Sequence, residues 1–240
     1  MTDKLNVNTI VPAGSTLTVG TSGGSVVMTD DVKVNTVKDA GGNTLWVSNG
    51  SGVLSSVNSA FGGSLKLIQT QTVTNTTNVD FTSGIDSTYK EYVFKFININ
   101  PATDNVYFQF QCNINSANVV MTTTYFLAYK SEDGTQGAIG YGPSMDQAQT
   151  DGMQRLMNNM GNDADACGAG ELHLFNPSST TYAKNFFATI NNYDEGNTTP
   201  GRSWNAGIAG ILNTTTAITE VRFNMSSGNY DGIIKMYGVL

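Results

Sequence analysis

The chain has 240 residues, of which 13% are charged and 39% hydrophobic, and it contains 26 glycines. This composition is too apolar for a disordered chain and too poor in charged helix-forming residues for a helical bundle. The formal net charge of −7, with no run of Lys or Arg, argues against a nucleic-acid partner, because phosphate binding needs clustered cations. No apolar run approaches the roughly 20 residues that span a bilayer, so membrane insertion is not expected.

The N-terminal residues, MTDKLNVNTIVPAGST, contain no apolar core of the signal-peptide kind, so we expect synthesis and assembly in a cytoplasm. Cys112 and Cys167 are too few for a disulfide framework, and we expect both to be buried free thiols. The abundant Asn, Thr, Ser and Gly residues suit turns and solvent-facing strand positions. They favour an all-β protein of an extracellular or particle surface.

An internal repeat marks the first quarter of the chain. LNVNTIVPAGSTLTVG at Leu5–Gly20 recurs about 27 residues later as VKVNTVKDAGGNTLWVS at Val32–Ser48, with one residue inserted after the glycine. Each copy predicts a strand, a glycine-containing turn and a second strand. Strands this short cannot bury an apolar face alone, and two copies make too little core for a solenoid.

We therefore interpret residues 1–58 as a short β-repeat shaft whose strands are completed by other chains. Three such segments around an axis would close one another's exposed edges. The glycines within residues 59–64 predict a linker. The alternative is an ordinary pair of N-terminal hairpins packed on the C-terminal domain.

Residues 65–240 predict an antiparallel β-sandwich head, with a jelly roll as the favoured version. The clearest strand is NVYFQFQCNI, in which alternation places Phe108 and Phe110 in the core and turns Gln109 and Gln111 away from it. Truncation of Gln111 should accordingly cost little. Turn residues separate the expected strands, which are 65–73, 89–99, 105–114, 119–130, 171–175, 184–192, 203–212, 217–225 and 232–239.

One segment, Ser144–Gly170, departs from this alternation. Its methionines and Leu156 fall at partly helical spacing, interrupted by Gly152. We interpret the segment as a long excursion from the sandwich, in which a helical turn and packing on a neighbouring subunit both stay open.

The residues of catalytic chemistry are sparse. His173 is the single histidine, and it should share a strand face with Glu171 and Phe175. Cys167 is too close in sequence to His173, and lacks an orienting partner, for a nucleophile–base pair. Adjacent acids in turns are typical of solvated caps and not of a glycosidase pair or a cation loop. We expect no enzyme activity, no bound metal and no cofactor, with glycan depolymerase as the least favoured alternative.

Receptor contact is expected from loops with aromatic rings among Asn, Asp and Gly, because a ring can stack on a sugar while amides bind its hydroxyls. The stretch 191–205 fits best, and 229–232 is second. The candidate receptor-binding residues are Tyr193, Asp194, Arg202, Trp204 and Tyr230. For Trp204 the alternative is a buried position on its strand.

The repeats, the turn DAGGNTLWVSNGSG, the head opening VDFTSGIDSTYKEYVFKFININPATDN and the ending YDGIIKMYGV resemble virion fibre proteins of tailed bacteriophages, especially those of aquatic phages. The resemblance implies a homotrimeric fibre in the virion, made in the host cytoplasm, with an N-terminal segment that binds other virion proteins. The head would then attach to the host surface, through a surface glycan in one version. The alternative is a capsid decoration or head-fibre protein that serves particle assembly.

Overall fold

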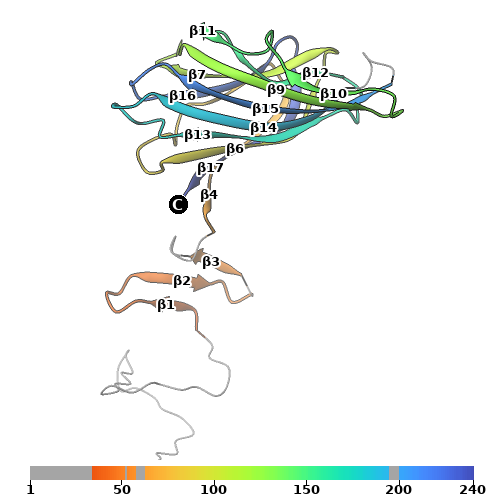
Figure 1. The fold of residues 1–240 in the computed structure, drawn as a ribbon. Coiled ribbons are helices and arrows are strands. Elements are labelled where there is room, and N and C mark those ends of the chain that lie inside the picture. The colour runs from red at the N-terminus through yellow and green to blue at the C-terminus, as the bar shows by residue number, and fades with distance from the viewer. Residues whose placement is uncertain (1–33, 52, 58–62, 195–199) are drawn as a thin grey trace, which may run out of the picture. The chain divides into compact units, whose positions relative to one another are not determined.

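A computed structural model describes residues 34–51, 53–57, 63–194 and 200–240 (Figure 1). The chain divides into two units, Met1–Phe61 and Gly62–Leu240. The first copy of the repeat lies outside the described residues. The second copy is described almost completely and forms the first two strands of the sheet in the N-terminal unit.

The N-terminal unit contains a three-stranded antiparallel sheet, β1 (Thr36–Lys38), β2 (Thr44–Ser48) and β3 (Leu54–Val57), in that order. The turn between β1 and β2 is held by Asp39, whose Oδ1 accepts a hydrogen bond from the Asn43 amide at 2.8 Å. Gly42 takes φ +82° there, a left-handed conformation that glycine adopts without strain. The predicted strand, turn and strand of the second copy are therefore confirmed.

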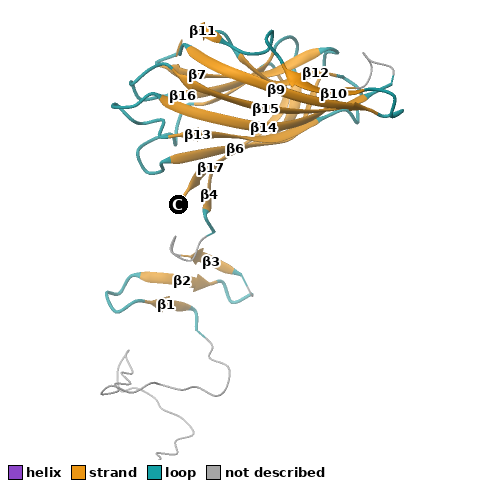
Figure 2. Cartoon of the chain, viewed as in Figure 1, coloured by secondary structure: helices purple, strands orange, loops and turns teal. Residues whose placement is uncertain are grey.

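The C-terminal unit is built from two antiparallel sheets. The large sheet has nine strands in the order β10-β9-β15-β14-β13-β6-β17-β4, with β11 paired to β9. The small sheet has five strands in the order β12-β7-β16-β5, with β8 paired to β7. Figure 2 shows only strands and loops in the described part of the chain. The all-β sandwich predicted for the head is confirmed.

The large sheet contains β4 (Leu65–Thr76), β6 (Glu91–Pro101), β9 (Met121–Ser131), β10 (Gly137–Tyr141), β11 (Ala148–Thr150), β13 (Gly168–Phe175), β14 (Lys184–Asp194), β15 (Arg202–Leu212) and β17 (Tyr230–Val239). The small sheet contains β5 (Asn78–Phe81), β7 (Val106–Ile114), β8 (Ala117–Asn118), β12 (Gln154–Met160) and β16 (Glu220–Met225). All nine predicted strands are present, within a few residues of their expected ends. The strands β5, β8, β10, β11 and β12 were not predicted.

The prediction that Ser144–Gly170 leaves the sandwich is wrong. Its centre forms β12, which pairs with β7 in the small sheet, and Leu156, Met157 and Met160 are fully buried. The register of β12 shifts between Arg155 and Met157 and again between Met157 and Met160. Each bulge offsets the alternation of side chains, so a buried strand acquires spacing that looks partly helical.

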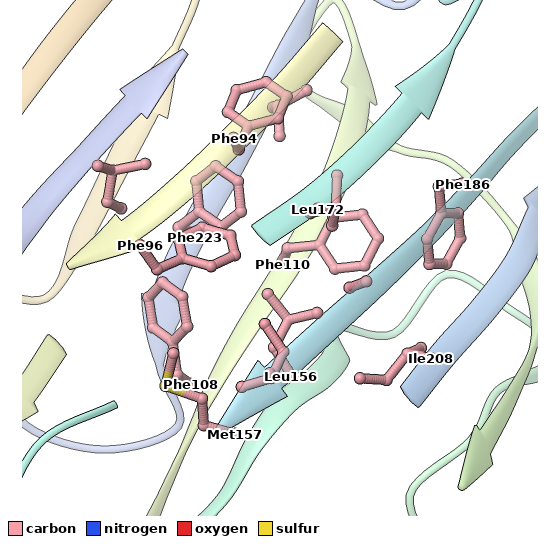
Figure 3. Packing of buried hydrophobic residues seen from close by; sticks show 14 of the residues in the cluster. Phe94, Phe96, Phe108, Phe110, Leu156, Met157, Leu172, Phe186, Ile208 and Phe223 are labelled. Carbon is pink, nitrogen blue, oxygen red and sulfur yellow. The ribbon is translucent and has the colours of Figure 1, made fainter. Parts of the chain in front are cut away.

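Phenylalanine rings fill the space between the sheets at the centre of the core (Figure 3). Phe223 of β16 is fully buried, and its ring contacts the rings of Phe81, Phe94, Phe96, Phe108 and Phe110 at centroid distances between 5.1 and 6.4 Å. Most of these pairs meet edge to face or tilted, the arrangements that aromatic quadrupoles favour. The ring cluster therefore joins β6 of the large sheet to β5, β7 and β16 of the small sheet.

Strand β7 confirms the predicted inward position of Phe108 and Phe110 but not the expected exposure of Gln111, which is fully buried. The Gln111 amide nitrogen donates to the carbonyls of Asp151 and Gly152, each at 2.9 Å. Its side-chain oxygen accepts from the Cys112 backbone amide at 2.8 Å. The segment before β12 thus covers the outer side of β7, and Gln111 satisfies the backbone there.

We expect Gln111→Ala to lower the free energy of unfolding by about 1–3 kcal/mol, because it removes three hydrogen bonds of a fully buried side chain. This replaces the small effect expected from the sequence. Gln109→Ala is the matched control, since Gln109 lies two residues away and is half-buried. Urea denaturation of both variants measures the difference, and equal losses would contradict the assigned role.

Candidate functional site

The structure brings four of the five predicted receptor residues together at the open end of the β14–β15 hairpin. Asp194 and Arg202 are paired across the two strands, and Tyr193 and Trp204 are their neighbours. The connecting residues 195–199 lie outside the described part. Tyr230 is elsewhere, at the start of β17, where its ring contacts Phe108 in the core. The predicted receptor-binding residues therefore lie at two separate places in the head.

The exposure expected of these rings is not found for two of them. Trp204 is 8% exposed, and its indole nitrogen donates to Asp194 Oδ2 at 3.2 Å. Tyr230 is 1% exposed, and its hydroxyl donates to the Phe223 carbonyl. Asp194 is also fully buried. Trp204 thus occupies the buried position given as the alternative, whereas Tyr193 and Arg202 are half-buried.

The hairpin end is held to the neighbouring β9–β10 turn by its own side chains. The Arg202 guanidinium lies over the Tyr129 ring at 5.0 Å and donates to Gln136 Oε1 at 2.6 Å. The Tyr129 ring packs against Trp204 at a centroid distance of 4.9 Å. These contacts stabilise the end of the sheet, which is sufficient reason for aromatic residues at these positions.

A second candidate lies on the face of the large sheet that points away from the small sheet, which we call the outer face. On β9, β10 and β14 this face carries large apolar side chains that are 41–84% exposed: Phe126, Ile139, Tyr141 and Phe187. Phe126 and Tyr141 are cross-strand partners with ring centroids 5.4 Å apart. The sequence carries a signal for this face. Phe126 and Phe187 occupy the positions that alternation assigns to solvent.

A shallow hollow of about 420 Å³ opens on the outer face between β9 and β14. Its lining includes Thr122 and Thr124 of β9, Ala209 and Ile211 of β15, and Asn185 of β14. The register places Phe187 opposite Ala209 and Phe126 opposite Gly207, so the two rings stand on either side of small residues of β15. Neither ring lines the hollow itself, which lies beside them over Ala209, Gly210 and Ile211 of β15.

Next to the hollow, His173 is enclosed by other side chains. Its ring stacks on Phe187 with centroids 4.5 Å apart, Nδ1 lies 2.6 Å from Glu91 Oε1, and Nε2 lies 3.3 Å from Glu171 Oε1. Glu171 also pairs with Lys95 at 3.6 Å. These contacts confirm that His173 and Glu171 share a face. They also fix the ring of Phe187 in place.

The two cysteines are free thiols, as expected, but only Cys112 is fully buried, while Cys167 is half-buried. Burial raises the pKa of the Cys112 thiol, which disfavours its reactive thiolate form. Cys167 precedes β13 by one residue, so the six-residue separation along an extended chain keeps it about 20 Å from His173. The two do not form a nucleophile–base pair.

Among the described residues, no group of three or more His, Cys, Asp or Glu side chains could hold a metal ion. That part of the chain also contains no helix long and apolar enough to cross a membrane. No family model, curated protein or solved structure matches the chain.

Proposed function

We propose that this chain is a structural fibre protein of a bacteriophage virion. In this proposal it forms a homotrimer, binds other virion proteins through its N-terminal unit and contacts the host surface through its sandwich head. It is made in the host cytoplasm and has no catalytic role. One observation carries the proposal: the apolar side chains of the described N-terminal sheet are half-buried or exposed, and none of them is buried.

The apolar side chains of this sheet form a cross-strand row. Val37 of β1 is paired with Trp46 of β2, and Trp46 is paired with Val57 of β3. Val57 is 39% exposed, and the nearby Val53 and Leu54 are more than half exposed. A two- or three-stranded sheet without a covered apolar face is marginally stable in water. Copies of the same sheet from other chains would cover this row and close the edges of the strands.

For the head, we propose the jelly-roll-like class. The first four strands of the head alternate between the sheets, with β4 and β6 in the large sheet and β5 and β7 in the small sheet. Along the chain, β15 and β17 belong to the large sheet, and β16, which connects them in sequence, belongs to the small sheet. Repeated crossing between two sheets supports this class over a simple meander.

Light scattering of the full chain is expected to give three times the mass of one chain. Trp46→Asp should shift this to the mass of a single chain, because it places a charge in the apolar row at the proposed interface. Thr36→Asp is the control, since Thr36 is exposed and lies beside Val37 on the opposite strand face. A parent chain that is monomeric at micromolar concentration, or equal effects of the two variants, would overturn the shaft proposal.

A further inference from the structure

On three strands of the large sheet, β9, β14 and β15, the outer face carries almost no charged side chains. For a chain of net charge −7, acidic side chains would be expected on an exposed face of this size. Lys130, at one end of β9, is the one outward-facing charged residue on these strands. The other outward positions from β9 to β14 hold neutral hydroxyls, neutral amides and apolar groups: Thr122, Thr124, Phe126, Ala128, Asn185, Phe187, Thr189, Asn191, Tyr193, Ser203, Asn205, Gly207, Ala209 and Ile211.

Two exposed rings of this face lie beside the hollow described above. Phe126 and Phe187 stand two strands and two residues apart, a separation of about 12 Å, with Gly207 and Ala209 between them. A Cβ atom added to Gly207 would meet no atom within 4 Å. The space above Gly207 is therefore open, and a sugar ring could lie there between the two phenylalanines.

The polar groups of this face are held in defined directions. The amide nitrogen of Asn191 donates to the Trp204 carbonyl at 2.8 Å, and that of Asn205 donates to the Ile190 carbonyl at 3.2 Å. Each of these bonds leaves the side-chain oxygen as an acceptor. Ring contacts hold Phe187 against His173 and Phe126 against Tyr141, so little side-chain freedom would be lost on binding.

We propose that the open surface between Phe126 and Phe187, beside the hollow, binds a neutral saccharide. Aromatic rings pack against the C–H faces of a sugar, and hydroxyls and amides exchange hydrogen bonds with its hydroxyl groups. A charged sugar finds no countercharge among the outward-facing residues of β14 and β15 that form this surface. A second copy of the chain fits less well, because it would bury Thr122, Thr124, Asn185 and Asn205 against a surface that must then satisfy each of them.

This inference rests on the proposed function, because it names the ligand class that the head would contact on a host surface. A single shallow site predicts weak affinity. Three sites on one particle can raise the apparent affinity by roughly 10²–10⁴ when the saccharide repeats. The proposed surface lies on strands and not at the hairpin end, so its geometry does not depend on loop conformation.

The test titrates the full chain with dextran, maltohexaose, cellohexaose and yeast mannan as neutral probes, and with alginate as a charged one. At least one neutral probe should bind and alginate should not. Gly207→Leu fills the open space and should abolish detectable binding without a change in melting temperature. Phe187→Ala should weaken binding by about tenfold. Gly140→Leu is the matched control, since Gly140 also has open space around its Cβ position but lies on β10 opposite Leu127, away from the outer face.

The inference is overturned if no neutral probe binds, or if Gly207→Leu binds as tightly as the Gly140→Leu control. It is also overturned if Gly207→Leu lowers the oligomeric mass, since the face would then be a contact between copies of the chain. Light scattering keeps the two proposals apart. A monomer that binds a neutral saccharide contradicts the fibre alone, and a trimer that binds none contradicts the saccharide site alone.

Discussion

Phe223→Ala is expected to lower the free energy of unfolding of the head by about 3–5 kcal/mol, because it empties the centre of the core. Phe223 has no exposed surface and its ring touches five other phenylalanines, drawn from both sheets. Its removal leaves a cavity whose walls belong to different strands. Because those walls are held by two sheets, they cannot collapse onto one another easily.

Urea denaturation followed by circular dichroism measures this loss. Phe187→Ala is the control, since it removes the same ring from a side chain that is 41% exposed on the outer face. We expect the control to lose about 1 kcal/mol or less. Similar losses for the two variants would mean that the ring cluster is not the centre of the core.

The head is also expected to unfold in alkali, at pH values above 10, mainly through two of its buried tyrosines. Burial raises the pKa of Tyr125 and Tyr230 above the ordinary 10.0, and the charge of Asp80 adds to the shift at Tyr230. The Tyr125 hydroxyl donates to the Leu156 carbonyl, so its ionisation would also remove a hydrogen bond. Above pH 10 the unfolded chain releases these two protons while the folded chain keeps them. Stability is therefore complete below pH 10 and falls by about 1.4 kcal/mol per pH unit for each tyrosine.

Lys184 acts in the opposite direction over a narrower range. Burial lowers the pKa of its ammonium group below 10.5, so this group adds stability as the pH rises towards 10.5 and adds no more beyond it. The tyrosines therefore dominate at higher pH.

Phenolate absorbance and circular dichroism, followed together through an alkaline titration, measure the alkaline transition. Tyr125→Phe and Tyr230→Phe should each move the unfolding midpoint to higher pH relative to the parent. Tyr182→Phe should leave it unchanged, because Tyr182 is 70% exposed. If all three variants unfold at the same pH, the buried phenols do not control the transition.

The strands that could be predicted from the sequence are those whose alternation is unbroken. Strand β14 alternates buried and exposed side chains over most of its length, as β9 does in its first half, because one face meets the core and the other meets solvent. Strand β12 could not be predicted, since two bulges offset its side chains. Gln111 was misjudged for a related reason. Alternation assigns a face to a residue, but it does not say that the loop before β12 will cover that face.

Prediction of the candidate site from the sequence was limited in the same way. Rings near turn residues were expected to be exposed, yet Trp204 and Tyr230 each hydrogen-bond inside the fold. Aromatic residues at strand ends serve packing as readily as binding. A better sequence signal for a binding surface was an apolar residue at a solvent-facing strand position, as at Phe126 and Phe187. Which of these residues lie side by side depends on the order of the strands, and the sequence does not reveal that order.

The order of strands in the large sheet also bears on how the head folds. Strand β17 lies between β6 and β4 and pairs with both, although about 150 residues separate it from β4 in the chain. Neither β4 nor β6 can complete its pairing until the ribosome has released the end of the head. Completion of the large sheet is therefore a late and slow step, because it depends on contacts between strands distant in sequence. Until β17 has paired, the exposed edges of β4 and β6 make the chain prone to aggregation.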